Sequence, residues 1–569
     1  MIALATSALL APASAIDLCT AAEIGAPDVA PDGRSVVFVW SRLGDADLWL
    51  APLPAGEPKA LVAEPGDESD PHFSPDGRTV SYVGEGLEQR ADIFVVDAGG
   101  GPPRNLSSHP AHDTAPRFSP DGRRLVFFSD RDGAGGDLYE IDLVSNQTRR
   151  LTRRAAPRDS QPAPDGVVLR ATRGGRAELR WLPEKGRERR FGPRSLRPVG
   201  NVAWSADGQR AAVAAHAGDR LRIALVERQG RTTSWLASEE DADHRTPRIS
   251  PAGDAIAFLR ETSEATTLIV RPLDGRAAAT ISAPAGVVSE FAWLPDGSGL
   301  VYVREHATLP RSLFLGTLEA PASEPLVHAA PSLGEVPLHA FRRVTITRGA
   351  AIPPLSAWVA APLPERAGRG VVFVHDGSTS MARDAYSPLI QFLVARRYAV
   401  VIPDLVPARL AGDERSTKAW AARQAQDVAL AAGWLAREAL AAPGRIAVVG
   451  EGRVGGYLAL AAAASAPDGL RAVVSIGGAP DLGLLHAESP RRRTRREPSL
   501  PRDRLEAVMC VYGKEDPLLP PAQQFRQGLE KHGAAAPATI YEAEGSPLRG
   551  RRNRADALER IEHFLMTRL

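Results

Sequence analysis

A glycine-rich stretch in the second half of the chain has the spacing of a site that could hold a cofactor or a nucleophile. It reads RIAVVGEGRVGGYLALAAAAS over residues 445–465, with an apolar run before the glycines and an alanine-rich run after them. Gly450, Gly452 and Gly455 form G-x-G-x-x-G, the pattern of a dinucleotide-binding turn. The nucleophile elbow of serine hydrolases, G-x-S-x-G, also joins a strand to a helix. The stretch therefore allows two chemistries, one using a dinucleotide cofactor and one using a nucleophilic serine.

The dinucleotide interpretation requires an acidic residue about 20 residues further on, at the end of the next strand. The next strand pattern, RAVVSIGGAPDL, reaches its first acidic residue only at Asp481, after a Gly-Gly-Ala-Pro turn. The glycine-rich turn also follows the third strand of its region, whereas the dinucleotide pattern usually opens its unit. An oxidoreductase acting through this turn is therefore the remote alternative, and we expect no cofactor.

Strand and helix patterns alternate on both sides of the glycine-rich turn. Apolar runs typical of buried strands read GVVFVHDG, YAVVIPD, RIAVVGEG, LRAVVSIGG, AVMCVYGKED and ATIYEAEG. Helical patterns lie between or after them, near residues 385–396, 418–440, 455–466, 521–533 and 553–568. Such alternation is typical of a doubly wound, mostly parallel sheet covered by helices. We therefore expect an α/β domain over residues 336–569.

A short motif similar to SPDGR recurs through the first half of the chain. Its aspartate position recurs at intervals of 44, 45, 44, 42, 45 and 44 residues, at Asp32, Asp76, Asp121, Asp165, Asp207, Ala252 and Asp296. The Asp-Gly pair indicates a tight hairpin, because glycine tolerates positive φ and the aspartate side chain caps the turn. Four short strands at this period form one blade of a propeller. The repeats predict an all-β, seven-bladed β-propeller over residues 17–335.

The composition limits the classes of partner. The chain has 569 residues, with 69 basic and 68 acidic side chains, and its formal net charge of +1 gives no general attraction to nucleic acid or to an anionic membrane. Its 2 cysteines cannot form a disulfide framework, and no spacing typical of a zinc site is present. We therefore expect no nucleic-acid partner, no membrane partner and no metal.

The chain begins MIALATSALLAPASAIDL, an apolar segment that ends in the A-x-A pattern Ala13-Ser14-Ala15. This arrangement is typical of a secretory signal peptide, although the basic residues that usually precede the apolar part are not in the sequence. We expect residues 1–16 to be a signal segment and the protein to be periplasmic or secreted, as in bacterial export. Without export, the expected location is cytoplasmic.

A propeller followed by an α/β domain resembles the prolyl oligopeptidase family of serine peptidases, and the similarity extends over nearly the whole chain. The elbow of that family reads like G-G-S-Y-G-G-Y, and EGRVGGY at residues 451–457 aligns with it through G-G-Y. The family's acid lies in a motif like H-G-x-x-D-x-x-V-P, and YGKEDPLLP places it at Asp516. The family's histidine follows E-G ahead of the closing helix, and EAEGSPLRG places Ser546 there. The resemblance implies a seven-bladed propeller and an α/β-hydrolase domain.

The resemblance also implies that two members of the catalytic triad are missing. Arg453 stands at the nucleophile position, Ser546 stands at the histidine position, and only Asp516 is retained. An arginine stays protonated in proteins, so it is neither a nucleophile nor a general base. A serine cannot replace an imidazole whose pKa lies near neutrality.

The region expected to stabilise an oxyanion departs from the family as well. The family's first strand ends like H-G-G-P, whereas this chain reads HDGSTS, and the segment VPARLAG lacks the family's N-x-R-G-S pattern. The residues placed in this oxyanion and elbow region are His375, Asp376, Gly377, Gly452, Val454 and Gly455. Other serines and histidines form no convincing second site; those considered are Ser378, Ser475, His486 and His563.

Arg453 also has an interpretation of its own. It lies in a tight turn at the start of a predicted helix, and helix N-termini bind anions. A peptide carboxylate or a phosphate is one candidate partner, and an internal ion pair with Glu451 or Asp516 is the other. Because no catalysis would maintain backbone strain, we expect Arg453 to lie outside the strained conformation of a nucleophile.

The sequence therefore predicts a prolyl-oligopeptidase-like protein that is catalytically inactive and that acts in peptide or protein binding or as a scaffold. Its ligand is expected in the cleft between the propeller and the α/β domain. The alternative is an active serine peptidase that cleaves short peptides with relocated catalytic residues. The sequence leaves the oligomeric state open.

Overall fold

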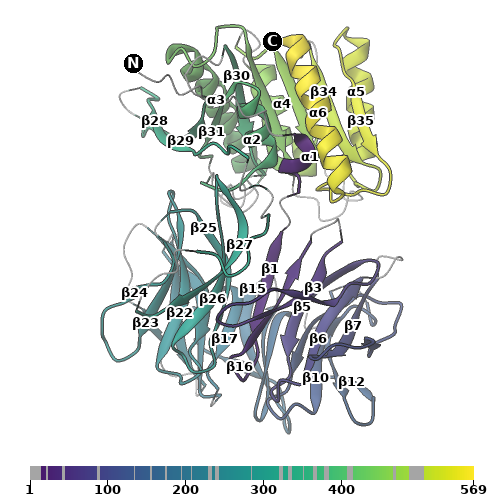
Figure 1. The fold of residues 1–569 in the computed structure, drawn as a ribbon, viewed down its shortest axis with the longest axis vertical. Coiled ribbons are helices and arrows are strands. Elements are labelled where there is room, and N and C mark those ends of the chain that lie inside the picture. Colours follow the sequence, from purple (N-terminus) through teal and green to yellow (C-terminus); the bar gives the residue numbers. More distant parts are fainter. Residues whose placement is uncertain are drawn as a thin grey trace, which may run out of the picture. The chain divides into compact units, whose positions relative to one another are not determined.

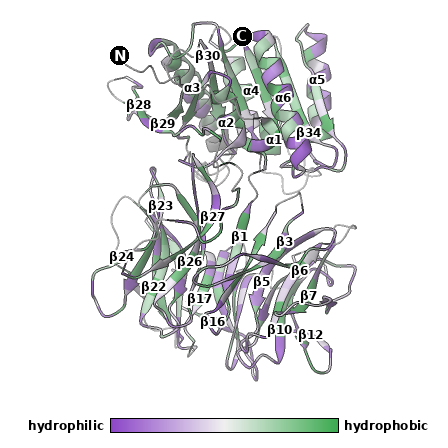
Figure 2. Cartoon of the chain, in the orientation of Figure 1, coloured by the Kyte–Doolittle hydropathy of each residue, from purple (hydrophilic) through white to green (hydrophobic). Residues whose placement is uncertain are grey.

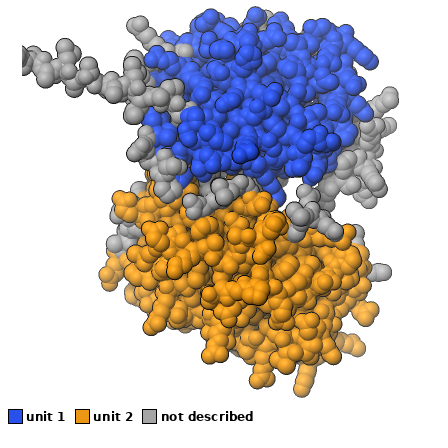
Figure 3. Space-filling model, turned by 45° about the vertical axis from the view of Figure 1, so that its right-hand side comes forward, with its two compact units in different colours: residues 1–21, 330–569 blue, residues 22–329 orange. Residues whose placement is uncertain are grey.

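A computed structural model shows the fold of the chain. It describes residues 14–569 except 21–22, 42–44, 86–89, 134, 154–156, 174–175, 194, 207, 219, 229–232, 237–241, 284, 320–323, 331–332, 334–335, 350–351, 363–367, 377–382, 406–413, 466–468 and 486–504. The chain forms two compact units, which are coloured separately in Figure 3. Unit 1 comprises residues 1–21 and 330–569, and unit 2 comprises residues 22–329.

Unit 2 is built from consecutive antiparallel sheets (Figure 1). The first three are β1 (Ile24–Val29), β2 (Ser35–Trp40), β3 (Asp47–Pro52) and β4 (Lys59–Val62); β5 (Asp67–Phe73), β6 (Thr79–Glu85), β7 (Ala91–Asp97) and β8 (Arg104–Asn105); and β9 (Asp113–Phe118), β10 (Arg124–Ser129), β11 (Asp137–Asp142) and β12 (Thr148–Arg150). The next two are β13 (Pro157–Ala163), β14 (Gly166–Arg173), β15 (Arg176–Pro183) and β16 (Arg189–Phe191); and β17 (Pro198–Trp204), β18 (Arg210–Ala217), β19 (Arg220–Glu227) and β20 (Thr233–Trp235).

The last two blades are joined by a single parallel pair between Thr266 and Val287. They are β21 (Asp243–Ile249), β22 (Ala255–Glu261), β23 (Thr266–Pro272) and β24 (Ala279–Thr280), followed by β25 (Val287–Trp293), β26 (Gly299–His306) and β27 (Leu309–Thr317). An isolated bridge from Leu313 to Val327 stands in the fourth-strand position of the last blade. The described part of unit 2 thus contains seven blades, and the predicted propeller is confirmed.

The Asp-Gly turns have the conformation that the repeat predicts. In the second blade, Asp76 Oδ1 accepts hydrogen bonds from Ser74 Oγ at 2.6 Å and from the amide of Arg78 at 3.1 Å, while Gly77 has a φ of 73°. The same aspartate-to-amide bond recurs in the turns of Asp32, Asp121 and Asp296. The repeat position Asp207 lies outside the described residues.

The first two strands of every blade shift in register at a bulge, and polar side chains on these inner strands link neighbouring blades. Asp28 of the first blade accepts a hydrogen bond from the amide of Phe73 in the second at 2.8 Å. Asp70 of the second blade accepts one from Arg117 of the third at 2.8 Å. The innermost strands are therefore held together by charged and backbone groups as well as by apolar packing.

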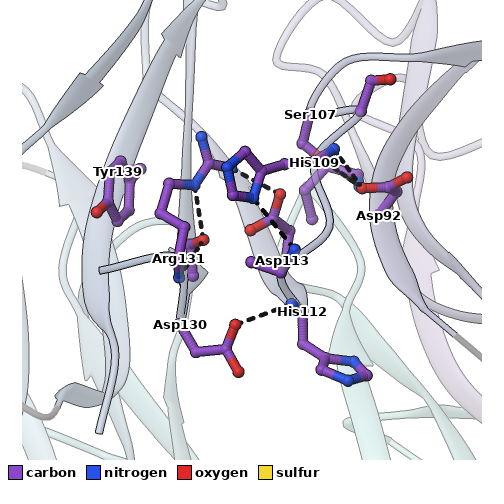
Figure 4. A network of polar contacts seen from close by, with 12 residues as sticks. Asp92, Ser107, His109, His112, Asp113, Asp130, Arg131 and Tyr139 are labelled. Carbon is purple, nitrogen blue, oxygen red and sulfur yellow. Dashed lines mark hydrogen bonds and ion pairs between the residues drawn. The ribbon is translucent and has the colours of Figure 1, made fainter. Parts of the chain in front are cut away.

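The first and last blades close the ring in the same way. Glu290 accepts a hydrogen bond from the amide of Ala26, and apolar residues of both blades form one buried cluster that includes Ile24, Phe38 and Val301. A second polar network lies in the third blade, where Arg131 stands between Asp113 and the ring of Tyr139 (Figure 4). Asp113 is fully buried, and its bond from Arg131 measures 2.7 Å.

Unit 1 is centred on a sheet with the strand order β28-β29-β31-β30-β32-β33-β34-β35. The strands are β28 (Arg342–Ile346), β29 (Leu355–Ala360), β30 (Arg369–Val374), β31 (Tyr398–Pro403), β32 (Ile446–Glu451), β33 (Ala472–Ile476), β34 (Val508–Gly513) and β35 (Ala538–Tyr541). From β31 to β35 all neighbouring strands are parallel, and β28 and β29 are antiparallel to their neighbours. The predicted mostly parallel α/β sheet is confirmed.

Helices cover both faces of this sheet. One apolar cluster contains residues of α3 (Glu414–Arg437), α4 (Gly452–Ser465) and α5 (Leu519–Lys531), and the other contains residues of α1 (Ala15–Leu18), α2 (Pro388–Ala395) and α6 (Arg551–Arg568). A short 3₁₀ helix, η3, spans Leu482–Leu484. Figure 2 colours α4 as largely hydrophobic, in agreement with its continuous burial from residue 454 to 464. Among the described helices, none combines the length and the apolar character that a membrane span requires.

The short helix α1 is part of unit 1 although it precedes the propeller in the sequence. Ala15 and Leu18 are buried, and the Tyr386 hydroxyl donates to the carbonyl of Leu18 at 2.9 Å. Arg551 of α6 donates to Thr20 Oγ1 at 2.6 Å. The expected division at residues 16–17 and 335–336 therefore differs from the observed units, because residues 15–20 pack on the α/β unit.

Candidate functional site

The residues singled out from the sequence lie at the carboxyl ends of five adjacent parallel strands. In α/β sheets this edge is where ligands usually bind. The segments are His375 and Asp376 after β30, Glu451 and Gly452 after β32, Gly477 after β33, Asp516 after β34 and Ser546 after β35. Gly377 and Ser378 lie outside the described residues, as do His486 and the segment VPARLAG.

The turn from β32 into α4 places its left-handed residue at Gly452, whose φ is 74°. Arg453 lies in the first turn of α4 and is not among the residues with positive φ. The expectation that Arg453 lies outside the strained conformation is therefore confirmed, because a glycine one position earlier adopts it at little cost. Neither Gly452 nor Arg453, the two residues at this turn, carries a hydroxyl group.

Close packing around the turn explains its other glycines. A Cβ atom at Gly450 would lie 2.1 Å from the carbonyl oxygen of Gly455, and one at Gly455 would lie 2.5 Å from the carbonyl oxygen of Val374. The three glycines of the G-x-G-x-x-G pattern therefore have structural reasons to be glycine. Asp481 caps the 3₁₀ helix η3 by accepting a hydrogen bond from the amide of Gly483 at 2.8 Å, which gives it a local role.

The carboxylate of Asp376 lies against the start of α4. Its Oδ1 accepts a hydrogen bond from the amide of Val454 at 3.2 Å. A Cβ atom at Gly452 would lie 2.4 Å from the Cβ of Asp376 and 2.8 Å from its Oδ2. The Asp376 carboxylate therefore accepts from an amide at the N-terminus of α4. The sequence predicted that an anion could bind at this helix end, beside Arg453.

Asp516 is buried, with an exposed fraction of 3%. Its Oδ1 accepts a hydrogen bond from the amide of Leu518 at 2.8 Å, and its Oδ2 has no geometrically satisfactory partner among the described residues. Burial raises the pKa of Asp516 and outweighs the Leu518 amide, the Arg453 guanidinium and the Ser546 hydroxyl, which lower it. Asp516 thus caps its own turn and lies near the hydroxyl of Ser546.

The loop that carries Ser546 is fixed by Glu544. The Glu544 carboxylate accepts hydrogen bonds from the amides of Arg549 and Gly550, at 2.7 and 2.9 Å, and from Asn553 Nδ2 at 2.7 Å. A Cβ atom at Gly477 would lie 2.6 Å from Ser546 Oγ and 3.7 Å from Asp516 Oδ2. Asp516 and Ser546 therefore both lie near the same glycine.

The remaining described candidates do not form a second catalytic group. Ser475 is fully buried beneath Gly456 and Gly478, whose Cβ positions would lie 2.6 and 2.2 Å from its Oγ. His563 is exposed on α6. Burial lowers the pKa of His375 to about 4, so its imidazole is neutral and a weak base near pH 7. In the described ranges no group of three or more His, Cys, Asp or Glu side chains is arranged to hold a metal ion.

Two interactions of this site are not predicted by the sequence motifs. The aspartate in HDGSTS was placed in the oxyanion region, but its bond to Val454 depends on how β30 and β32 pair and was not predictable from the motif. Arg554 of α6 was not singled out, although its charge lowers the pKa of Glu451. Its only sequence signal is a basic residue in the first turn of the last helix.

Comparisons with known proteins agree with this architecture. A family model described as the TolB beta propeller domain matches residues 18–178, within the propeller. No curated protein sequence matches the chain. A puromycin-hydrolysing peptidase of Mycobacterium tuberculosis is similar in structure, with a TM-score of 0.79 and 19% identity over 98% of this chain and 96% of that one.

Two further structures extend the similarity. The acylaminoacyl peptidase of Pyrococcus horikoshii has a TM-score of 0.74 and 16% identity over 98% of this chain and 97% of that one. A prolyl endopeptidase has a TM-score of 0.74 and 17% sequence identity, over 97% of this chain and 90% of that one. The chain has the fold of the prolyl oligopeptidases and acylaminoacyl peptidases. At these identities the comparison shows the fold alone.

Proposed function

We propose that this protein is a catalytically inactive member of the prolyl-oligopeptidase-like proteins that binds peptides or proteins at the carboxyl edge of its α/β sheet. The observation that carries this proposal is that Asp516 and Ser546 lie at the same glycine, Gly477, and that the turn into α4 is formed by Gly452 and Arg453. Acyl transfer by the serine route requires a hydroxyl or thiol and an imidazole within hydrogen-bond reach. Neither residue at the elbow supplies the first, and Ser546 does not supply the second.

The environment of Asp376 supports the same conclusion. A developing oxyanion is stabilised by backbone amides aimed at it, and the start of α4 would provide one. The Val454 amide instead donates to the Asp376 carboxylate, whose negative charge would repel an oxyanion. The same carboxylate disfavours a dinucleotide pyrophosphate at this turn, which argues against the oxidoreductase alternative.

Peptide binding is the ligand class that the similar structures favour. One similar structure is described as an acylaminoacyl peptidase in complex with Z-Gly-Gly-Phe-chloromethyl ketone, with a TM-score of 0.74 and 17% identity. The carboxyl edge of a parallel sheet remains a suitable binding surface when catalytic residues are absent. We therefore assign a binding or scaffolding role to this edge.

Labelling with a fluorophosphonate tests the proposal, because this reagent reacts with activated serines. The purified protein, its Ser378→Ala variant and an active peptidase of the same fold are treated in parallel. We expect no adduct on the protein while the active peptidase is labelled completely. A stoichiometric adduct would refute the proposal, and its loss in Ser378→Ala would identify the serine.

A double variant tests whether the absence of a serine at position 453 and of a histidine at position 546 is sufficient to explain the proposed inactivity. In Arg453→Ser combined with Ser546→His, the triad residues return, but Asp376 still lies against Gly452. We expect labelling to stay at background in this variant. Strong labelling would show that the elbow geometry is intact and that Asp376 does not obstruct it.

We also propose that the protein is exported. Ser14 caps α1 by accepting a hydrogen bond from the amide of Asp17 at 3.2 Å, and Ala15 is 1% exposed. Cleavage after Ala15 would remove both residues from the folded unit, whereas cleavage after Ala13 would preserve them. Mass spectrometry of the protein from a periplasmic fraction is expected to find Ser14 at the amino terminus, and an intact leader would contradict export.

A further inference from the structure

Arg117 and Arg248 have equivalent places on the inner strands of the third and sixth blades. Each follows a proline and stands four residues before the repeat position of its blade. Each is the first residue to pair with the second strand after a bulge, and both bulges begin with a residue of positive φ, Ala115 at 56° and Thr246 at 50°. Because the pairing is the same, the two arginines lie on the same face of their inner strands.

The preceding blade supplies a carboxylate to Arg117. Arg117 Nη1 donates to Asp70 Oδ2 at 2.8 Å, and Asp70 begins the bulge of the second blade with a φ of 51°. The surrounding protein lowers the pKa of Arg117, but the charge of Asp70 and its hydrogen bond outweigh this effect and raise it. The guanidinium of Arg117 is therefore compensated by a side chain of the neighbouring blade.

The blade that precedes Arg248 supplies no such carboxylate. The bulge of the fifth blade begins with Gly200, which has a φ of 73°, and continues with the neutral Asn201. A Cβ atom at Gly200 would have no heavy atom of a non-neighbouring residue within 4 Å. Among the described residues, none forms a hydrogen bond or an ion pair with the guanidinium of Arg248. The place that Asp70 fills beside Arg117 is thus open beside Arg248.

Arg248 is accessible, and its charge lacks a direct counterion in the part of the ring that the structure describes. The residue is exposed to solvent although it stands on an inner strand. The protein around it, and next the Arg117 guanidinium, lower its pKa. The carboxylates that raise this pKa come from other blades, and each already accepts a hydrogen bond from a nearer donor; they are Asp28, Asp159 and Asp70.

We propose that Arg248 binds a carboxylate of a ligand, such as the carboxy terminus of a peptide, in the place that corresponds to the Asp70 carboxylate beside Arg117. A guanidinium can donate two parallel hydrogen bonds to one carboxylate, and this planar geometry gives specificity as well as energy. The aspartates that act on Arg248 would repel a doubly charged phosphate more strongly than a singly charged carboxylate. This site belongs to the propeller and goes beyond the binding proposed for the sheet edge.

Isothermal titration calorimetry with three probes at pH 7 tests the proposal. N-acetyl-Gly-Phe carries a carboxylate, N-acetyl-Gly-Phe-amide is its neutral counterpart, and inorganic phosphate is the competing anion. We expect the carboxylate probe to bind about tenfold more tightly than the other two. Its affinity is expected to fall as salt is added, because salt screens the attraction to the guanidinium.

Substitutions of Arg248 and of a surface arginine locate the effect. Arg248→Gln removes the charge and is expected to abolish the preference for the carboxylate probe. Arg248→Lys keeps the charge but not the planar group, so it is expected to retain only part of the preference. Arg276→Gln removes an exposed arginine of the same blade and is expected to have no effect.

Gly200→Asp tests where the carboxylate binds. Asp70 adopts a positive φ at the start of its own bulge, and aspartate and asparagine tolerate this conformation better than most residues. The introduced carboxylate would be an internal counterion for Arg248, and we expect the carboxylate probe to bind about tenfold more weakly. Gly200→Asn adds a neutral side chain of the same size and is expected to retain binding. Circular dichroism melts verify that each variant is folded.

The preference for the carboxylate probe, lost in Arg248→Gln and Gly200→Asp but kept in Arg276→Gln and Gly200→Asn, would support the proposal. Equal binding of the acid and amide probes, tighter binding of phosphate, or no binding of the acid probe would overturn it. Equal losses in Gly200→Asp and Gly200→Asn would overturn the place assigned to the carboxylate. If either variant of Gly200 is unfolded, the comparison of Arg248→Gln with Arg276→Gln decides the outcome.

Discussion

Charged side chains converge at the inner strands of the propeller and at the carboxyl edge of the α/β sheet, and the two regions differ in how these charges are compensated. In the propeller, Asp70 accepts a hydrogen bond from Arg117 at 2.8 Å and lies 3.0 Å from His72 Nε2. At the sheet edge, Asp516 has one bond from the Leu518 amide and an oxygen that lacks a partner among the described groups.

The pKa values of the two aspartates shift in opposite directions. Burial raises the pKa of Asp70, but Arg117 and His72 outweigh it and hold the pKa well below its usual range. Burial raises the pKa of Asp516 more than the Leu518 amide, the Arg453 guanidinium and the Ser546 hydroxyl lower it. The difference predicts that the Asp70 charge stabilises the propeller, whereas the Asp516 charge is retained at a cost to the stability of the α/β unit.

The largest expected effect comes from removing the compensated charge. Asp70→Asn leaves Arg117 and His72 without their carboxylate and is expected to lower the free energy of unfolding by about 2 kcal/mol at pH 7. Because the folded pKa of Asp70 lies below the ordinary value of 3.8, this stabilisation is present above that value. It is lost as the pH falls through the folded pKa. Urea unfolding of both proteins between pH 7 and pH 3 measures the difference.

A matched control tests whether an ion pair on the inner strands contributes more to stability than one on the surface. Asp274 forms an ion pair with Arg276 at 2.7 Å on the surface, where both side chains are more than half exposed. Asp274→Asn is expected to have little effect on unfolding, because exposed ion pairs contribute little. Equal losses in the two variants would contradict the distinction between the inner strands and the surface.

The propeller was predictable because the same sequence motif recurs in each blade. A period near 44 residues fixes the blades, and the Asp-Gly pair fixes each first hairpin. The inner-strand contacts were not predictable, because Asp70 and Arg117 lie in different blades and meet only after a bulge turns their strands. The docking of α1 on α6 joins residues more than 500 positions apart, and no local pattern records such a contact.

Removing the charge of Asp516 is expected to raise the free energy of unfolding, whereas removing that of Asp70 lowers it, and the change is expected to be smaller. Its folded pKa is raised above the ordinary value of 3.8, so the ionised carboxylate disfavours folding at neutral pH. Asp516→Asn keeps an oxygen for the Leu518 amide and is expected to raise the free energy of unfolding by about 1 kcal/mol at pH 7. The gain should disappear in acid, below the unfolded pKa, where wild-type Asp516 is protonated in both states.

Asp516→Ala is the control for this variant, because it removes the oxygen that accepts from the Leu518 amide as well as the charge. It is expected to be less stable than Asp516→Asn. A loss of stability in Asp516→Asn itself would show that Asp516 is compensated as Asp70 is, and would remove the contrast between the two regions.

The candidate site was partly predictable for a related reason. The sequence motifs around Asp516 and Ser546 are local, and the structure brings both residues to Gly477. The carboxylate of Asp376 at the start of α4 depends on the pairing of β30 with β32. Motif alignment places residues at the correct ends of strands but does not determine which donor each side chain reaches.

The smallest expected effect concerns a charge that is compensated within its own turn. Asp121 Oδ1 accepts hydrogen bonds from Ser119 Oγ at 2.5 Å and from the amide of Arg123 at 3.1 Å, and the bond from Ser119 lowers the pKa of Asp121 most. Asp121→Ala is expected to cost about 0.5 kcal/mol in urea unfolding, because only local bonds to a mostly exposed group are lost.

The sixth blade has an alanine at the position that corresponds to Asp121. Its turn therefore indicates why the effect of Asp121→Ala should be small. Ala252 stands at the repeat position there, and Ser250 Oγ donates to Asp254 at 2.8 Å instead. Gly253 keeps a φ of 73°, so the turn conformation does not depend on the aspartate. A loss in Asp121→Ala as large as that in Asp70→Asn would mean that the turn carboxylates, like those of the inner strands, hold the blades together.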